Sequence, residues 1–198
     1  MKVYHVSETL KLNEELKTDY KEQANLAEPF VKAMKHSFEM FYGMLLQADY
    51  MGAALAKFNL SGMPTNETKW ATEGIFEYIR RNEFPDAPSR LKANYFFKDS
   101  EQCKMLFTEH WGMDEKKEEA EQFHLYELEL EGNYLECDMN LFDEAFDQIW
   151  ELDSPMQMMN AMNLARKYFR GDRGENAVME IISEEKAVAV KDVTALLR

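Results

Sequence analysis

The sequence predicts an α+β protein, with short strands at both ends and in the middle and with helices between them. The first strand is predicted by Val3-Tyr4-His5-Val6-Ser7, a run rich in β-forming residues. From Phe30 onward, apolar residues recur in steps of three and four, which is the spacing of an amphipathic helix. Strand-like segments around residue 130 and after residue 177 supply the remaining strands.

The composition agrees with one globular domain. The chain has 198 residues, of which 45% are hydrophobic and 30% charged, so there is enough material for a sizeable core. Eight Gly and five Pro exclude a fibrous or low-complexity chain. Because no repeat or linker interrupts the sequence, we expect a single domain over residues 1–198, with a helical insertion around 29–82.

A long helix is predicted from Phe30 to Phe58, with Pro29 suited to its first turn. Gly43 or Gly52 is expected to interrupt it, because Gly is a poor helix former. The elements that follow are a closing loop at Asn59–Pro64, a helix from about Asn66 to Arg81, a non-helical Phe84–Arg90 segment, a strand at Asn94–Phe97, and a helix from Asp99 toward Trp111. Two prolines make the Phe84–Arg90 segment extended.

Two hairpins and two helices are predicted in the second half of the chain. Gly132-Asn133 suits a two-residue turn, which sets Leu128 opposite Cys137 and Glu129 opposite Glu136. The predicted elements are strands at Tyr126–Glu131 and Tyr134–Met139, helices at Leu141–Trp150 and Pro155–Arg170, and a second hairpin formed by Ala177–Ser183 and Ala187–Val190.

The predicted central hairpin places acidic residues opposite one another on one face. Glu129 faces Glu136 and Glu127 faces Asp138, and like charges directly opposite cost up to about 1 kcal/mol each. This pattern has two interpretations. It is a solvated face of an acidic protein, or a row of carboxylates relieved by a cation or a basic partner. No His or Cys completes a site with metal-ligand spacing, so no metal is expected.

Charge and cysteine content exclude several classes of function. With 23 basic and 37 acidic residues, the net charge is −14, which disfavours nucleic acid as a partner. Two cysteines, Cys103 and Cys137, are too few for a disulfide framework, and the first residues form no signal peptide, so a cytoplasmic location is expected. The longest apolar stretch, Phe38–Phe58, is too polar to span a membrane.

Three residues stand out as candidates for chemistry. His5 is an ionisable ring in the centre of a short apolar strand, and a core histidine is the alternative interpretation. Arg90 precedes a strand that reads as buried, where it would hold an anion bidentately or form a salt bridge. Glu180 lies between Met179 and Ile181, and a carboxylate among apolar neighbours is costly unless it has a partner or a task.

These three places occur in an order that resembles the ADP-ribosyltransferase-like fold. Tyr4-His5-Val6 is similar to the first motif of its His-containing branch, and Phe84-Pro85-x-x-Pro88-Ser89-Arg90-Leu91 resembles an uncharacterised bacterial family assigned to this fold. The run from Tyr168-Phe169-Arg170-Gly171 to Glu180 is similar to the carboxy-terminal signature, in which an aromatic pair and a glycine precede the strand with the catalytic glutamate. Phe169 stands where a Trp is expected.

The resemblance implies a split antiparallel β-sheet with helices inserted between strands, and one ADP-ribosyltransferase-like domain. It implies NAD as a substrate and mono-ADP-ribosyl transfer to a protein or small-molecule acceptor. Glu180 would be catalytic, His5 would anchor the adenosine-side ribose or phosphate, and Arg90 the pyrophosphate. Tyr95 or Tyr168 would stack on nicotinamide, while Ser89 matches the second motif loosely.

A second function class is a non-enzymatic acidic protein that masks a basic partner surface, as inhibitors that imitate nucleic acid do. That interpretation uses the net charge and the carboxylates of the central hairpin. The enzyme interpretation instead uses His5, Arg90 and Glu180, and it predicts that these three side chains line one cleft. A protein of the same fold that has lost catalysis is a third possibility. The sequence leaves the oligomeric state open.

Overall fold

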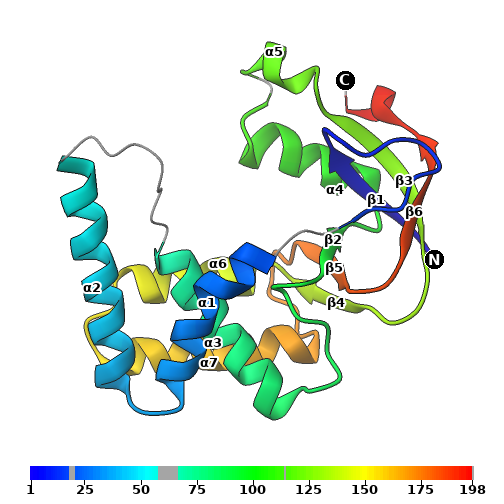
Figure 1. Cartoon of the computed structure of the whole chain (residues 1–198). Helices are drawn as coiled ribbons and strands as arrows, with labels where there is room; N and C mark the ends of the chain where they lie inside the picture. Colours follow the sequence, from blue (N-terminus) through cyan, green and yellow to red (C-terminus); the bar gives the residue numbers. More distant parts are fainter. Residues whose placement is uncertain (18–20, 58–66, 114, 198) are drawn as a thin grey trace. The chain divides into compact units, whose positions relative to one another are not determined.

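The computed structural model describes residues 1–17, 21–57, 67–113 and 115–197, and it confirms the α+β class (Figure 1). The strands are β1 (Lys2–Ser7), β2 (Asn94–Phe96), β3 (His124–Leu130), β4 (Leu135–Asp138), β5 (Met179–Ser183) and β6 (Ala187–Asp192). The helices are α1 (Lys21–Met34), α2 (Phe38–Lys57), α3 (Glu67–Glu83), α4 (Ser100–Met105), the π-helix η1 (Leu106–His110), α5 (Lys117–Ala120), α6 (Asn140–Trp150), α7 (Pro155–Arg170) and the 3-10 helix η2 (Thr194–Leu196).

The chain divides into two compact units, each made of stretches that are distant in sequence. Unit 1 consists of Met1–Thr18, Ala93–Cys137 and Val178–Arg198 and contains nearly all of the strands. Unit 2 consists of Asp19–Lys92 and Asp138–Ala177 and contains the longer helices. The predicted helical insertion around 29–82 corresponds to α1, α2 and α3, all of which belong to unit 2.

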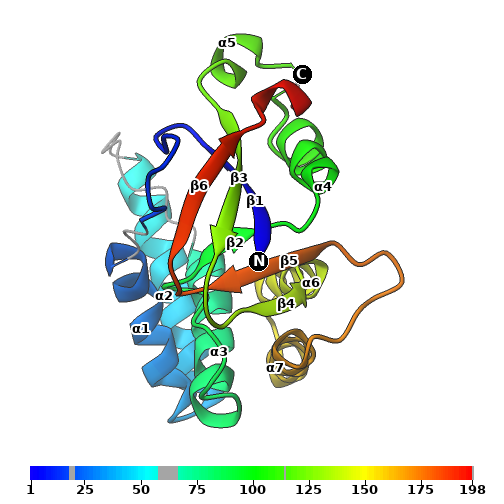
Figure 2. The same ribbon diagram turned by 90° about the vertical axis from the view of Figure 1, so that its right-hand side faces the viewer.

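The strands form two small antiparallel sheets, in the orders β1-β3-β6 and β2-β5-β4 (Figure 2). An antiparallel bridge between Tyr4 and Phe97 joins the two sheets. Its hydrogen bonds are reciprocal, because the Tyr4 amide donates to the Phe97 carbonyl at 2.7 Å and the Phe97 amide donates to the Tyr4 carbonyl at 3.0 Å. Beyond this bridge the strands belong to different sheets, so the arrangement is a split sheet.

Both predicted hairpins are wrong, although their segments are strands. β3 pairs with β1 on one side and with β6 on the other, so neither of its edges is left for β4. Leu128 therefore pairs with Val3 and Ala189 rather than with Cys137. The connections β3–β4 and β5–β6 each carry the chain from one sheet to the other, and Gly132 adopts a φ of +76° in the first of them.

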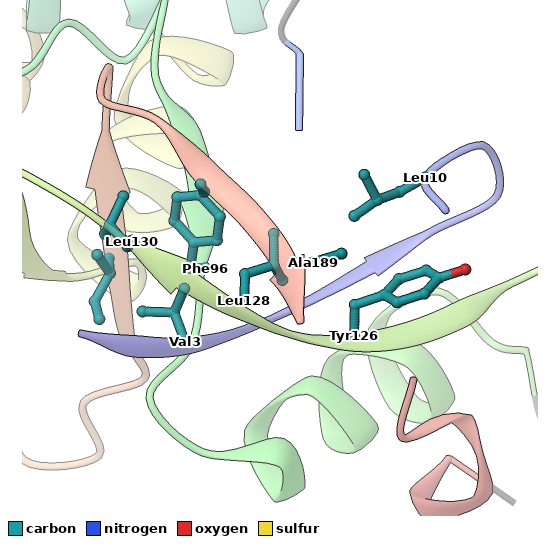
Figure 3. Close-up of a cluster of buried hydrophobic side chains, with 9 residues drawn as sticks. Val3, Leu10, Phe96, Tyr126, Leu128, Leu130 and Ala189 are labelled. Carbon is teal, nitrogen blue, oxygen red and sulfur yellow. The ribbon is translucent and has the colours of Figure 1, made fainter. Parts of the chain in front are cut away.

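The core of unit 1 lies where the two sheets meet, and it contains residues of both (Figure 3). Val3, Leu128 and Leu130 come from the first sheet, while Phe96 and Ile181 come from the second. These five side chains are at most 2% exposed. Alternation along each strand sends them to one face, so burial of that face fixes the register of both sheets.

The long predicted helix is in fact two helices, and the break lies at Lys35–Ser37 rather than at Gly43 or Gly52. Ser37 begins α2, and its hydroxyl accepts a hydrogen bond from the Met40 amide at 3.2 Å, which is the function of an N-cap. α1 also starts earlier than predicted, so Pro29 lies inside it. The expected loop at Asn59–Pro64 and the boundaries at Phe58 and Asn66 lie outside the described residues.

The end of unit 2 follows its sequence signals. Ser154 and Gln157 form a capping box at the start of α7, Pro155 occupies the first turn, and Gly171 ends the helix with a φ of +74°. α6 and α7 are joined by four residues, 151–154, and pack as a helical hairpin.

None of the described helices is long and apolar enough to cross a membrane.

Candidate functional site

In unit 1, the split between the sheets brings His5 of β1 against β2. The His5 Nδ1 atom lies 2.8 Å from the Tyr95 carbonyl oxygen, and the His5 ring meets the Phe96 ring edge-on with 5.9 Å between centroids. A carbonyl oxygen can only accept, so Nδ1 carries the proton in this hydrogen bond. Next to the Tyr4–Phe97 bridge, the connection between β1 and β2 is therefore made by the His5 side chain. In a regular β-ladder a backbone amide would donate to this carbonyl.

The environment of His5 keeps its imidazole neutral. Burial lowers the pKa of His5 from its ordinary value, and this effect outweighs the hydrogen bond to Tyr95, which acts to raise the pKa. With the proton on Nδ1, the second ring nitrogen, Nε2, is a hydrogen-bond acceptor. A neutral acceptor of this kind suits a hydroxyl group, such as a ribose hydroxyl, better than it suits a phosphate.

Glu180 lies on β5, the strand next to β2, and is 7% exposed. β2 and β5 pair with Tyr95 opposite Ile182 and Phe96 opposite Ile181. Alternation then places Glu180 and Ile182 on the same face of this sheet as Tyr95, opposite to the core face of Ile181. Diagonal neighbours on one face are about 7–8 Å apart. This distance can be spanned by long side chains such as those of Tyr95 and Glu180.

Arg90 belongs to unit 2, where it is buried in a polar cluster. Its guanidinium donates to both carboxylate oxygens of Glu73, at distances between 3.1 and 3.3 Å, and also donates to the Tyr168 hydroxyl. The guanidinium carbon lies 4.0 Å from the centre of the Phe142 ring. These contacts are the salt bridge that the sequence offered as the alternative to anion binding.

Ser89 is held by a second carboxylate, one helical turn along α3. The Ser89 hydroxyl donates to Glu77 Oε2 at 2.9 Å, and Arg80 and Arg81 donate to the same carboxyl group. Burial acts to raise the pKa of Glu77, but the hydrogen bonds from Arg80 and Arg81 outweigh it and hold the pKa below its ordinary value. Arg80 also donates to the Pro85 and Ala87 carbonyls.

Sequence reasoning missed Glu73 and Glu77, the two carboxylates of α3 that fix the Ser89-Arg90 dipeptide. They are 5% and 4% exposed. The available signal was position, because residues 73 and 77 fall among the buried stripe of the predicted helix, next to Gly74 and Ile75. Acidic residues at such places require a cationic partner, and Arg80, Arg81 and Arg90 supply it.

The two tyrosines proposed for nicotinamide have different surroundings. Tyr168 is fully buried, and its ring lies 5.4 Å from that of Phe76 and 5.3 Å from that of Phe169. Tyr95 is partly exposed on β2. A stacking platform needs an accessible ring face, so Tyr95 is the better candidate of the two, and Tyr168 acts on Arg90 through its hydroxyl.

The six candidate residues thus fall into two groups. His5, Tyr95 and Glu180 lie on neighbouring strands of unit 1, with the His5 ring against Phe96 on one face and the Tyr95 and Glu180 side chains on the other. Ser89, Arg90 and Tyr168 lie in the polar interior of unit 2. That Arg90 joins His5 and Glu180 in one cleft stays a prediction. Within the described ranges, no group of three His, Cys, Asp or Glu side chains has the arrangement of a metal site.

The two cysteines lie apart from the candidate side chains as separate thiols. Cys103 and Cys137 are both buried and reduced. Burial, aided by the charge of Asp99, raises the pKa of Cys103 to about 12, which keeps the thiol protonated at neutral pH. Cys137 donates from Sγ to the Glu180 carbonyl oxygen at 3.8 Å.

The fold and the candidate residues define an α+β protein with a split antiparallel sheet and a histidine, a tyrosine and a glutamate on strands beside the split. The chain belongs to the family described as "Protein of unknown function (DUF2441)", whose model matches residues 3–195. No curated protein matches the chain.

Proposed function

We propose that this protein binds NAD and transfers its ADP-ribosyl group to a protein or small-molecule acceptor. The observation that carries the proposal is the split of the sheet beside the Tyr4–Phe97 bridge, where the His5 ring is hydrogen-bonded to the Tyr95 backbone carbonyl and Glu180 lies on the next strand. The resemblance of the three motifs to the ADP-ribosyltransferase-like fold supports it independently of this geometry.

The chemistry follows from the bond between nicotinamide and ribose in NAD. When this bond breaks, neutral nicotinamide leaves with the bonding electrons and positive charge develops on the ribose. A nucleophilic acceptor then bonds to the same carbon and releases its proton. The Glu180 carboxylate would stabilise the developing charge, which is the kind of electrostatic contribution that a buried carboxylate supplies.

The other residues would bind and orient NAD. The neutral Nε2 atom of His5 would accept a hydrogen bond from a ribose hydroxyl, while Nδ1 stays bound to the Tyr95 carbonyl. The Tyr95 ring would offer a face to nicotinamide. Arg90 is proposed for the pyrophosphate, with Ser89 beside it, on the sequence resemblance alone, because in the structure its guanidinium donates to Glu73 and to the Tyr168 hydroxyl.

Comparison of the unmodified protein with Glu180→Gln tests the proposal. NAD binding is measured by calorimetry, and nicotinamide release by chromatography with and without candidate acceptors. We expect Glu180→Gln to retain the fold and most NAD binding, because the charge matters chiefly as positive charge develops. Its turnover should fall about a hundred- to a thousand-fold.

Glu129→Gln is the matched control, since Glu129 is an exposed strand glutamate of the same unit and the same change of charge is made there. It should leave binding and turnover unaltered. If the unmodified protein neither binds NAD nor releases nicotinamide, the proposed function is wrong. If it binds NAD but never cleaves it, a binding protein of the same fold is the appropriate description.

The acidic-inhibitor alternative loses its specific support in the structure, because the predicted row of paired carboxylates does not form. Glu127 accepts from Lys2 at 2.6 Å, and Glu136 pairs with Lys98. Asp138 is buried and accepts from the amides of Asn140 and Gly174. These carboxylates are neutralised or used within the chain, so they do not present one anionic surface.

A further inference from the structure

The helical hairpin α6–α7 of unit 2 carries a groove built from residues that the proposed function does not use. The cavity has a volume of about 530 Å³. Its walls include Glu144 and Gln148 from α6 and Asn160, Asn163, Lys167 and Arg170 from α7. The side chains of Asn160 and Gln148 are joined by a hydrogen bond of 3.2 Å, which ties the two walls together near the turn of the hairpin.

An exposed stripe runs along α7 on the groove side. Residues 156, 160, 163, 167 and 170 are spaced by three or four, and residue 159 is three after 156, so all six lie on one face of the helix. The end of the stripe nearer the turn is apolar, with Met156 62% and Met159 54% exposed. The other end is basic, with Lys167 and Arg170. Methionine side chains in such exposed positions are typical of binding surfaces.

The two walls carry opposite charges, and in the described part of the chain these charges do not form ion pairs with each other. Glu144 and Asp147 are exposed on α6, and Lys167 is exposed on α7. Glu144 and Lys167 border the same cavity, yet among the described residues neither they nor Asp147 enter an ion pair. The neighbouring cations differ, because Arg166 pairs with Glu83 and Arg170 pairs with Asp172.

We propose that the outer surface of the α6–α7 hairpin, from Met156 to Arg170 with Glu144 and Asp147, binds a second copy of the chain. An interface with two-fold symmetry brings each wall against the opposite wall of the second molecule. The acidic wall of α6 then meets the basic end of α7, and this happens twice. Met156 and Met159 are covered in the same contact.

The charge pattern favours this occupant over others. An acidic segment opposite both walls meets Glu144 and Asp147 with like charge. A basic partner meets Lys167 and Arg170. A partner that pairs with both walls must place basic groups opposite α6 and acidic groups opposite α7. A second copy related by a two-fold axis does so with its own α7 and α6. Exposed ion pairs are weak, and two copies that each carry a net charge of −14 repel each other at longer range, so the dimer is modest in affinity.

Sedimentation velocity of the full chain tests this proposal at protein concentrations from about 1 to 200 µM, at low salt and at about 0.5 M salt. We expect a concentration-dependent dimer at both salt concentrations, because salt screens the attraction between the walls and the repulsion between the two −14 chains alike. Lys167→Glu and Glu144→Lys each replace two attractions by two repulsions, so each should weaken self-association about tenfold or more. Circular dichroism and a melting curve verify that both variants are folded.

An equimolar mixture of Lys167→Glu and Glu144→Lys is the decisive sample. In the mixed dimer every reversed charge faces its opposite, so association should return although neither variant associates alone. Lys11→Glu, an exposed residue of unit 1 with the same change of charge, should dimerise like the unmodified chain. A chain that stays monomeric throughout, or a mixture that fails to restore the dimer, overturns the proposal.

Discussion

The imidazole of His5 is both a candidate ligand and a structural connection, because its Nδ1 atom donates to β2 across the split. Its lowered pKa gives this connection a pH dependence. The unfolded chain takes up a proton at His5 as the pH falls through about 6.5, whereas the folded chain takes it up only at lower pH. The stability contributed by neutral, buried His5 is therefore present above that pH and is lost progressively as the pH falls below it.

Replacement of His5 by Asn isolates this effect, since the Asn amide nitrogen takes the place of Nδ1 and has no titration. We expect the unmodified protein to lose more stability than His5→Asn between pH 7 and pH 5. Denaturant unfolding at a series of pH values measures the difference. Parallel pH profiles for the two proteins would mean that the histidine titrates alike in the folded and unfolded states.

The buried pair of Glu73 and Arg90 makes a second prediction at this scale. Removing one partner of a buried ion pair leaves an uncompensated charge, which typically costs about 3–5 kcal/mol. We expect Glu73→Gln to lower the free energy of unfolding by an amount in this range. Adding Arg90→Met to it should recover part of the loss, because the stranded guanidinium is then gone. Chemical denaturation of the two single variants and the double variant forms the cycle.

Helices α1 and α3 approach each other closely, and Gly74 permits the contact. A Cβ atom at position 74 would lie 2.6 Å from the Phe30 Cβ atom and 3.3 Å from the Ala27 carbonyl oxygen. One neighbour is a backbone atom and the other is a Cβ atom, so neither can move away by a side-chain rotation. The helices themselves therefore have to move apart. Such overpacking typically costs about 1–3 kcal/mol.

Gly74→Ala should therefore destabilise the protein, although Ala is the better helix former by about 1 kcal/mol. Gly43→Ala provides the comparison within another helix of the same unit, since a Cβ atom there meets nothing within 4 Å. That variant should be stabilised by up to about 1 kcal/mol. Thermal melting of both variants gives the two signs, and equal shifts would contradict the close approach of α1 and α3.

The elements also show what local sequence patterns can predict. Ser154, Pro155 and Gly171 act within a few residues of the helix that they delimit, so α7 was predicted with its boundaries. Strand pairing is a long-range property. Gly132-Asn133 indicates a turn, but the partner of β3 is decided by β1 and β6, which come from the two ends of the chain.

The candidate site divides in the same way. His5 and Glu180 were identifiable because each is an ionisable residue in an apolar strand. The contact of His5 with the Tyr95 carbonyl depends on a residue 90 positions away and has no local signal. Glu73 and Glu77 were missed because acidic residues on a helix are ordinarily taken as solvated, and their arginine partners become evident when the helix is packed.

At the scale of the whole molecule, each compact unit is built from stretches that are distant in sequence, so a unit can fold only when its stretches come together. α3 packs against α1 from its own stretch and against α6 and α7 from the second stretch of unit 2. Phe76 of α3 contacts Phe142, Tyr168 and Phe169, all of which come from Asp138–Ala177. Neither stretch of unit 2 has a complete core by itself.

Two truncated proteins should therefore behave differently. Residues 19–92 alone should lack a cooperative unfolding transition, whereas residues 19–92 joined by a flexible Gly/Ser linker to residues 138–177 should unfold cooperatively. Circular dichroism during denaturation distinguishes the two. A cooperative transition in residues 19–92 alone would show that α1–α3 need no contribution from α6 and α7.

The Tyr4–Phe97 bridge gives the protein a pair of natural isotope-exchange reporters. The amides of Tyr4 and Phe97 are both hydrogen-bonded across the two sheets, so neither can exchange with deuterium until the bridge opens. Amides of β3, bonded on both sides within one sheet, report on the unfolding of that sheet instead. The ratio of the two exchange rates would measure how often the sheets part while each remains folded, and a ligand bound at the split would slow the first rate selectively.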